Sequence, residues 1–230
     1  AIVEAFYPPG AVAAATMIPP SLWGFNPDIP VVEYDPEGAM ALLAEAGYPD
    51  GFSEVHVLGM DDAGNVTDEV VDTIPVQLFY QPVTRPYNPD GEGIGEVQVS
   101  YLADIGIDAQ LSSAGDWSAF LAERREGNLL GLYQLGWTGD NGDPDNFLGY
   151  FFTGIDTPKA QEGWYQNAEL NELLLTARAM TSQEEREPLY QMADQMVYDD
   201  AARLYFAHTG VPLAFRSCVS GYVTNPLGTE

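Results

Sequence analysis

An acidic, glycine-rich loop is the segment whose residue types could do chemistry. Residues 136–147 read GWTGDNGDPDNF and carry three carboxylates, Asp140, Asp143 and Asp145, directly after the apolar run 129–135. A short apolar run of this kind predicts a buried strand, and a strand end is a rigid place from which a loop presents charge to a ligand. Asn-Gly and Asp-Pro pairs also form ordinary solvated turns. The spacing therefore leaves two interpretations open, a ligand loop and a solvent-facing turn.

Calcium is one ligand that such a loop could hold, because calcium prefers carboxylate oxygens. However, Gly142 stands where an EF-hand loop needs its second ligand, and no glutamate closes the loop. The sequence therefore predicts no metal ligands, and a calcium-binding domain is only a minor alternative.

Catalytic machinery is not recognisable in the sequence. His56 and His208 each fall in a predicted strand, where a lone histidine is most often structural, and we expect Cys218 to be a buried apolar filler. No Gly-x-Ser-x-Gly turn, phosphate-binding glycine loop or His-Glu-x-x-His motif occurs. We expect no catalytic residues and no cofactor, with a hydrolytic domain as the other minor alternative.

Arg85 is the basic residue whose surroundings suggest recognition. It lies in the segment QPVTRPYNP, where prolines restrict the backbone on both sides. A guanidinium held in this way suits bidentate capture of a carboxylate. An ordinary salt bridge to one of the 35 acidic residues of the chain is the competing interpretation.

Composition limits the possible partners. The 230 residues carry 35 acidic and 8 basic side chains, a net charge of −27, so nucleic acid and anionic lipid are unlikely partners. No apolar run approaches the ~20 residues that span a bilayer, so we expect a soluble protein. The start of the chain lacks a signal peptide and an initiator methionine, which suggests an excised piece.

Alternating strand and helix patterns predict an α/β fold with a mixed sheet flanked by helices, in a single domain over residues 1–230. Residues 1–34 are expected to be irregular and held by aromatic side chains, and residues 61–72 to form an acidic loop. The expected helices are 35–46, 93–105, 116–126, 147–153 (a single turn), 171–180 and 188–200, with a break at Pro188. The expected strands are 55–58, 76–80, 108–112, 129–135, 204–207 and 213–215.

Several motifs together resemble the dipeptide-binding proteins of ABC importers, in family 5 of the extracytoplasmic solute-binding proteins. They are, in order, EAFYPPGA (4–11), IPP (18–20) with WG (23–24), YDPE (34–37), ALLAEAGYPDGF (41–52), PVTRPYNP (82–89), the 136–147 loop, GYV (221–223) and NPLG (225–228). Members of this family have two lobes that close over the ligand. The resemblance implies that this chain is the second, C-terminal lobe of a class II periplasmic-binding-protein-like fold, with the first lobe missing.

The resemblance also implies ligand contacts. Asp140 matches the aspartate that pairs with the α-ammonium of the peptide, and Arg85 matches the arginine that holds its carboxylate. Trp137 begins the Asp140 loop, and Trp117 matches a second tryptophan that lines the pocket. A zwitterionic dipeptide needs one anchor of each charge, because both of its charges lose water when the site closes.

The implied function is capture of dipeptides or short oligopeptides outside the cytoplasm, without catalysis. The implied partners are the peptide, the membrane subunits of an ABC importer and the missing lobe, and the whole protein is expected to be periplasmic or extracellular and lipid-anchored. Haem, glutathione, a nickel chelate or a sugar are alternative ligands for the same fold.

Overall fold

The structure is a computed structural model that describes residues 1–210 and 213–223. Contacts within the chain divide it into two compact units. Unit 1 comprises Ala1–Val31, Gly136–Asp156 and Asn167–Glu230, and unit 2 comprises Val32–Leu135 and Thr157–Gln166. That residues 1–230 fold as one domain, and that this domain is the second lobe of a longer protein, stays a prediction.

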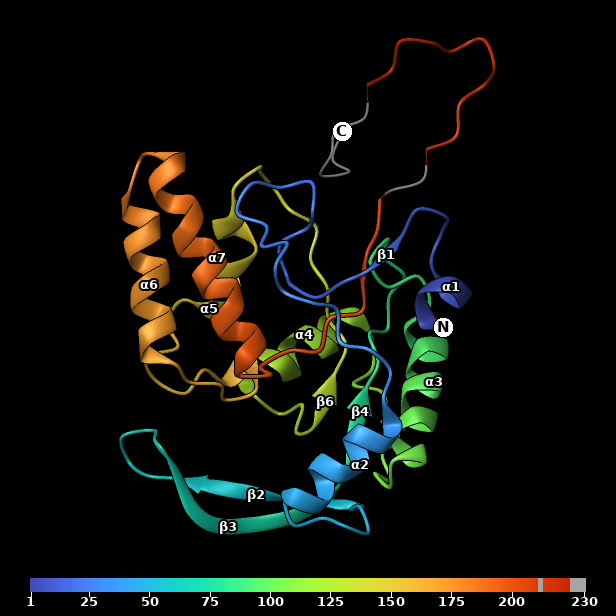
Figure 1. Ribbon diagram of the computed structural model, residues 1–230. Coiled ribbons are helices and arrows are strands. Elements are labelled where there is room, and N and C mark those ends of the chain that lie inside the picture. Colours follow the sequence, from blue (N-terminus) through green and yellow to red (C-terminus); the bar gives the residue numbers. More distant parts are fainter. Residues whose placement is uncertain (211–212, 224–230) are drawn as a thin grey trace. The chain divides into compact units, whose positions relative to one another are not determined.

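Unit 2 is built on a parallel three-stranded sheet. Strand β4 (Gln77–Phe79) lies between β5 (Gln110–Ser112) and β6 (Leu132–Tyr133), with Leu78 opposite Leu111 on one side and Leu132 on the other. Helix α3 (Gly91–Asp104) connects β4 to β5, and α4 (Trp117–Glu126) connects β5 to β6. These βαβ connections, visible in Figure 1, confirm the α/β fold class.

Local sequence signals set most helix starts in unit 2. The side chains of Asp35, Asp90 and Asp116 accept hydrogen bonds from the backbone N–H three residues later and cap α2 (Pro36–Glu45), α3 and α4. The predicted helices 35–46, 93–105 and 116–126 are therefore confirmed to within two residues. The predicted strand 129–135 is much shorter, since only Leu132–Tyr133 pairs with β4.

The acidic segment after Met60 is not a loop, as we had expected. Strand β2 (Glu54–Met60) pairs with β3 (Val66–Pro75) in a long antiparallel hairpin, drawn apart from the parallel sheet in Figure 1. Six of the ten residues in VTDEVVDTIP are β-branched, and they favour a strand despite three acids. The Asp61 side chain accepts hydrogen bonds from Ala63 N and Asn65 N and so shapes the turn.

Unit 1 packs helices around an aromatic core. It contains α1 (Ile2–Phe6), η1 (Pro144–Asn146), α5 (Leu148–Phe152), α6 (Ala168–Ala179), α7 (Gln183–Asp199) and the two-residue antiparallel pair of β1 (Val12–Ala13) with β7 (Ala207–His208). Helices α6 and α7 lie side by side and cover α5 (Figure 1). The core side chains include Ile18, Phe151, Phe152, Leu170, Leu174 and Val197, all at most 1% exposed.

Helix α7 runs through Pro188 without the predicted break. Ser182 caps it by accepting a hydrogen bond from Glu185 N, so the helix begins before the proline. Because Pro188 has no backbone N–H, the carbonyl of Glu184 lacks its helical hydrogen bond. Both residues are exposed, so water can donate to this carbonyl instead.

Other expectations for unit 1 need correction. Helix α6 begins at Ala168 because Asn167 caps it, three residues before the predicted start. A short helix, α1, forms in the segment expected to be irregular. Strand β7 overlaps the predicted strand 204–207 only at Ala207, and residues 213–215 form no strand.

The C-terminal segment also differs from expectation. Cys218 is exposed rather than buried, because every residue of 213–223 is exposed and none supplies a core. The 225–228 motif lies outside the described residues.

No helix in the described parts of the chain has the length and apolarity that crossing a membrane requires. The sequence likewise contains no apolar run long enough to span a bilayer.

Asp194 of α7 is a buried acid without a basic partner. Its side chain is 0% exposed, Oδ1 accepts a hydrogen bond from Met17 N at 3.3 Å, and Oδ2 has no hydrogen-bond partner in the described part of the chain. Burial raises the pKa of Asp194 to about 7, against 3.8 for an ordinary aspartate. The N-terminal segment around Met17 is thus held to α7 by a carboxyl that favours its protonated form.

This environment predicts a pH-dependent stability. Below about pH 4 the carboxyl is protonated in both folded and unfolded chains; above it the unfolded chain ionises first, so stability falls until about pH 7. At about 1.4 kcal/mol per pKa unit, the loss is on the order of 4 kcal/mol. We expect Asp194→Asn to remove most of this loss in urea unfolding measured from pH 4 to pH 8. Asp199→Asn, an exposed acid on the same helix, is the control; equal pH profiles for the two variants would contradict the assignment.

Candidate ligand-binding site

The 136–147 loop of unit 1 is folded by its own side chains. Asn141 Oδ1 accepts a hydrogen bond from Asp143 N at 3.0 Å, and Asp143 Oδ1 accepts one from Asp145 N at 2.9 Å. Asp143 thereby caps η1, whose first residue is Pro144. The turn-forming residue types that the sequence shows are used here to shape the loop, as the turn interpretation predicts.

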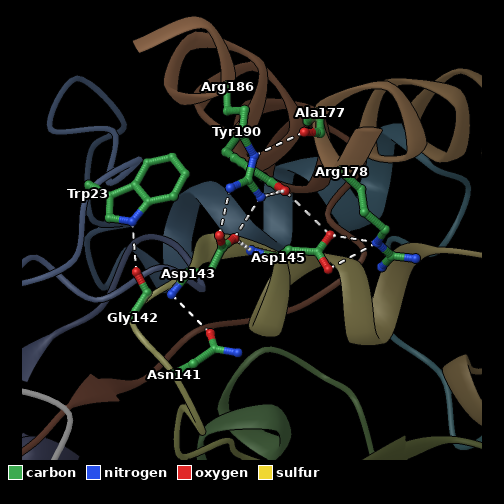
Figure 2. A network of polar contacts seen from close by, with 9 residues as sticks. All are labelled: Trp23, Asn141, Gly142, Asp143, Asp145, Ala177, Arg178, Arg186 and Tyr190. Carbon is green, nitrogen blue, oxygen red and sulfur yellow. Dashed lines mark hydrogen bonds and ion pairs between the residues drawn. The ribbon is translucent and has the colours of Figure 1, made fainter. Parts of the chain in front are cut away.

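Two arginines from α6 and α7 hold this loop from outside. Arg186 donates to both carboxylate oxygens of Asp143 at 2.7 and 2.9 Å, and Arg178 donates to Asp145 at 3.0 Å (Figure 2). Arg186 also donates to Ala177 O and to the hydroxyl of Tyr190. Both carboxylates are therefore engaged in ion pairs that fix the backbone on either side of Pro144.

The Arg186–Asp143 pair is partly buried, with the arginine more buried than the aspartate. The side chain of Arg186 is 13% exposed, and hydrogen bonding to Asp143 raises its pKa. Its guanidinium lies 5.2 Å from the ring centroids of both Trp23 and Tyr190. Burial raises the pKa of Tyr190 to about 12, so its hydroxyl stays protonated and donates to Asp145 Oδ1 at 3.4 Å.

The ion pairs leave no calcium site in the loop. Asp143 and Asp145 face arginines, and the described residues contain no group of three or more His, Cys, Asp or Glu side chains able to hold a metal ion. The calcium alternative therefore has no support in the geometry.

Asp140 and Trp137 are brought together by Asn146. Its Oδ1 accepts hydrogen bonds from Trp137 Nε1 and from Asp140 N, both at 2.9 Å. Its Nδ2 donates to Asp140 Oδ2 at 3.3 Å. Asp140 is exposed, and it forms no ion pair with a residue in the described ranges. Its carboxylate is thus placed by the fold and open to a ligand.

The Trp137 indole is fixed by aromatic packing. It stacks on Tyr150 with ring centroids 4.2 Å apart and meets the buried ring of Phe151 edge-on at 5.3 Å. An open hollow of about 430 Å³ lies beside this stack. It is lined by Asn141, Asp143, Asp145, Asn146, Tyr150, Arg178 and Arg186.

Arg85 and Trp117 are brought together in unit 2. The guanidinium carbon of Arg85 lies 5.7 Å from the ring centroid of Trp117, the first residue of α4, which stacks on Phe120. Arg85 N donates to Asn88 O at 2.9 Å and Asn88 N donates to Arg85 O at 3.0 Å, so the two residues close a tight turn. No carboxylate of residues 1–210 or 213–223 forms an ion pair with Arg85, so the salt-bridge interpretation is wrong for the described chain.

A buried amide cluster supports the Arg85 turn. Gln134 Oε1 accepts hydrogen bonds from Asn88 Nδ2 and Gln81 N, and Gln134 Nε2 donates to Gln98 Oε1 at 2.8 Å. All four side chains are at most 9% exposed. Sequence reasoning missed this cluster, because glutamines in strands and helices usually face solvent.

The four predicted ligand residues thus form two pairs, Asp140 with Trp137 and Arg85 with Trp117. Each pair lies within one unit. That all four contact one ligand stays a prediction.

Comparison with known proteins identifies the relatives of this chain. The model of the bacterial extracellular solute-binding proteins, family 5, matches residues 1–158. The chain belongs to this family. The resemblance inferred from the motifs is therefore confirmed.

Two curated relatives are equally similar. The chain is 35% identical over 231 residues to the dipeptide-binding protein of Escherichia coli, and 35% identical over 233 residues to heme-binding protein A of Haemophilus influenzae. These matches cover 99% and 100% of this chain but only 38% of either relative, so the chain spans well under half the length of the proteins it resembles.

Solved structures agree on the fold. The crystal structure of a dipeptide-binding protein from Pseudoalteromonas in complex with Met-Leu matches with a TM-score of 0.74 at 26% identity. The match covers 90% of this chain and 36% of that protein. The α/β fold is that of a part of a solute-binding protein.

The two loop arginines predict different stability costs. Arg186→Met leaves the partly buried Asp143 carboxylate without its ion-pair partner, and we expect the free energy of unfolding to fall by roughly 2–4 kcal/mol. Arg178→Met breaks a pair whose arginine is 43% exposed, and we expect a cost under about 1 kcal/mol. Denaturant unfolding of the two matched variants measures both, and equal costs would show that Arg186 is not the main support of the loop.

Proposed function

We propose that this chain is the second lobe of an extracytoplasmic solute-binding protein that captures dipeptides or short oligopeptides for an ABC importer. Asp140 pairs with the peptide α-ammonium and Arg85 with its α-carboxylate, while Trp137 and Trp117 form aromatic walls. The protein binds its ligand and does not transform it. The whole protein lies outside the cytoplasm, lipid-anchored, and works with the membrane subunits of the importer.

One observation carries the proposal. The described chain presents two side chains of opposite charge, each next to a tryptophan, and neither Asp140 nor Arg85 is neutralised by an ion pair. By contrast, the two arginines that line the hollow, Arg178 and Arg186, are both in ion pairs. An unpaired acid and an unpaired base on rigid turns are what a zwitterionic ligand requires. The names of the dipeptide-binding relatives support this ligand class.

Haem is a second candidate ligand. The relative named heme-binding protein A is as similar as the dipeptide-binding one. Titration of the full-length protein with haemin and, separately, with a dipeptide panel separates the two candidates. A new Soret band without any calorimetric response to peptides would favour haem.

Substitution at the two anchors should affect opposite ends of the peptide. We expect Asp140→Ala and Arg85→Ala each to weaken dipeptide binding by the full-length protein roughly 10²- to 10³-fold, because each strands a ligand charge in the closed site. Isothermal calorimetry measures the loss. Asp199→Ala and Arg125→Ala are controls on exposed helix residues of the same charge.

Blocked peptides assign each anchor. N-acetylation of the peptide should weaken its binding to the unsubstituted protein but should not further weaken its binding to Asp140→Ala. C-terminal amidation of the peptide should weaken its binding to the unsubstituted protein but should not further weaken its binding to Arg85→Ala. The same sensitivity to both blocking groups in all variants would refute the assignment of the two ends.

The 230-residue chain alone should bind dipeptides poorly. If it is one lobe, the contacts of the other lobe and the closing motion are absent, so the ligand charges keep access to water. We expect the chain to fold, as seen by circular dichroism, but to show no calorimetric binding at micromolar peptide. Submicromolar binding by the chain alone would contradict the proposal of a missing lobe.

A further inference from the structure

One amide side chain in unit 1 links the proposed ammonium anchor to the aromatic wall beside it. The Asn146 side chain makes three hydrogen bonds: its Oδ1 accepts from Trp137 Nε1 and Asp140 N, and its Nδ2 donates to Asp140 Oδ2. Two N–H groups can face only the oxygen of an amide, so the NH₂ group must face the carboxylate. The orientation of the amide is therefore dictated by its neighbours.

We infer that Asn146 is a positioning residue that sets the geometry of Asp140 and Trp137 for ligand recognition. The inference rests on the proposed function and extends it to a residue that does not itself need to touch the peptide. Asn146 Nδ2 engages Oδ2 of Asp140 and leaves Oδ1 for the ammonium group. Because the indole N–H of Trp137 is already used, this tryptophan offers the ligand its ring and not a hydrogen-bond donor.

The position of Asn146 is itself enforced by the arginine-held turn. It is the last residue of η1, and its N–H donates to Asp143 O at 3.0 Å. Asp143 and Asp145 of the same turn are held by Arg186 and Arg178 (Figure 2). Rigid helices α6 and α7 thus fix η1, and η1 fixes Asn146.

Other residue types could not replace this side chain. Alanine or serine is too short to bridge Trp137 and Asp140. An aspartate would keep the acceptor but would place a second carboxylate next to Asp140 Oδ2, where like charges repel. The inference therefore requires asparagine chemistry at position 146.

A double-mutant cycle in the full-length protein tests the inference. We expect Asn146→Ala to weaken binding of alanyl-phenylalanine roughly tenfold, because Asp140 and Trp137 lose their common partner. In an Asp140→Asn background, Asn146→Ala should weaken peptide binding less than about threefold, because the Asp140 carboxylate that Asn146 positions has already been removed. Asn128→Ala is the control, because Asn128 is an exposed asparagine of unit 2 whose side chain bonds Glu123 and Glu126, away from the 136–147 loop.

A second readout follows the hydrogen bonds directly. Hydrogen exchange by NMR should become about tenfold faster at the Trp137 indole N–H and the Asp140 amide in Asn146→Ala, but not in Asn128→Ala. Faster exchange together with the non-additive cycle supports the positioning role. Equal losses in both backgrounds, or unchanged exchange, would overturn it.

The outcomes separate this inference from the proposed function. Asp140→Asn with unchanged peptide affinity, or no peptide binding by the unsubstituted protein, overturns the proposed function and the inference with it. A loss in Asp140→Asn without a loss in Asn146→Ala overturns the inference alone.

Discussion

The bidentate ion pair between Arg186 and Asp143 is the interaction on which the candidate site of unit 1 depends. A carboxylate that is two-thirds buried would be unfavourable alone, so it must be met by a cation with matched geometry. The planar guanidinium supplies two parallel hydrogen bonds, and the rings of Trp23 and Tyr190 cover it. This pair joins α7 to a turn more than forty residues earlier in the chain.

Rigidity at that turn has a functional meaning. Asp140 is exposed and lies in a loop with several glycines, where a free chain would sample many conformations. The capped turn η1 and its arginine partners remove that freedom before any ligand arrives. Under the proposed function, peptide binding would therefore spend less free energy on ordering the loop, which is the physical advantage of a preorganised site.

In unit 2, neutral amide groups rather than ion pairs hold the turn that carries the charged residue. The Arg85 turn is anchored by buried amides of Gln81, Asn88, Gln98 and Gln134, while the guanidinium lies over the ring of Trp117. In each unit, internal hydrogen bonds thus position one charged residue that forms no ion pair within the described residues: Asp140 in unit 1 and Arg85 in unit 2.

The sequence by itself determined the fold class, the family and most helix starts. Capping side chains such as Asp35 and Asp116 act within a few residues, and motif order does not depend on packing. The Asn-Gly and Asp-Pro pairs of the 136–147 loop also indicated a turn, because turn formation is local.

Only the tertiary structure decided which partners those residues use. The ion pairs of Arg178 and Arg186 and the amide cluster around Gln134 join residues that no short window contains. Pro188 gave a local signal for a helix break, yet packing of α7 on α6 overrode it. Long-range contacts have no periodicity or spacing in the sequence, and this is why the supports of the candidate site became visible only in three dimensions.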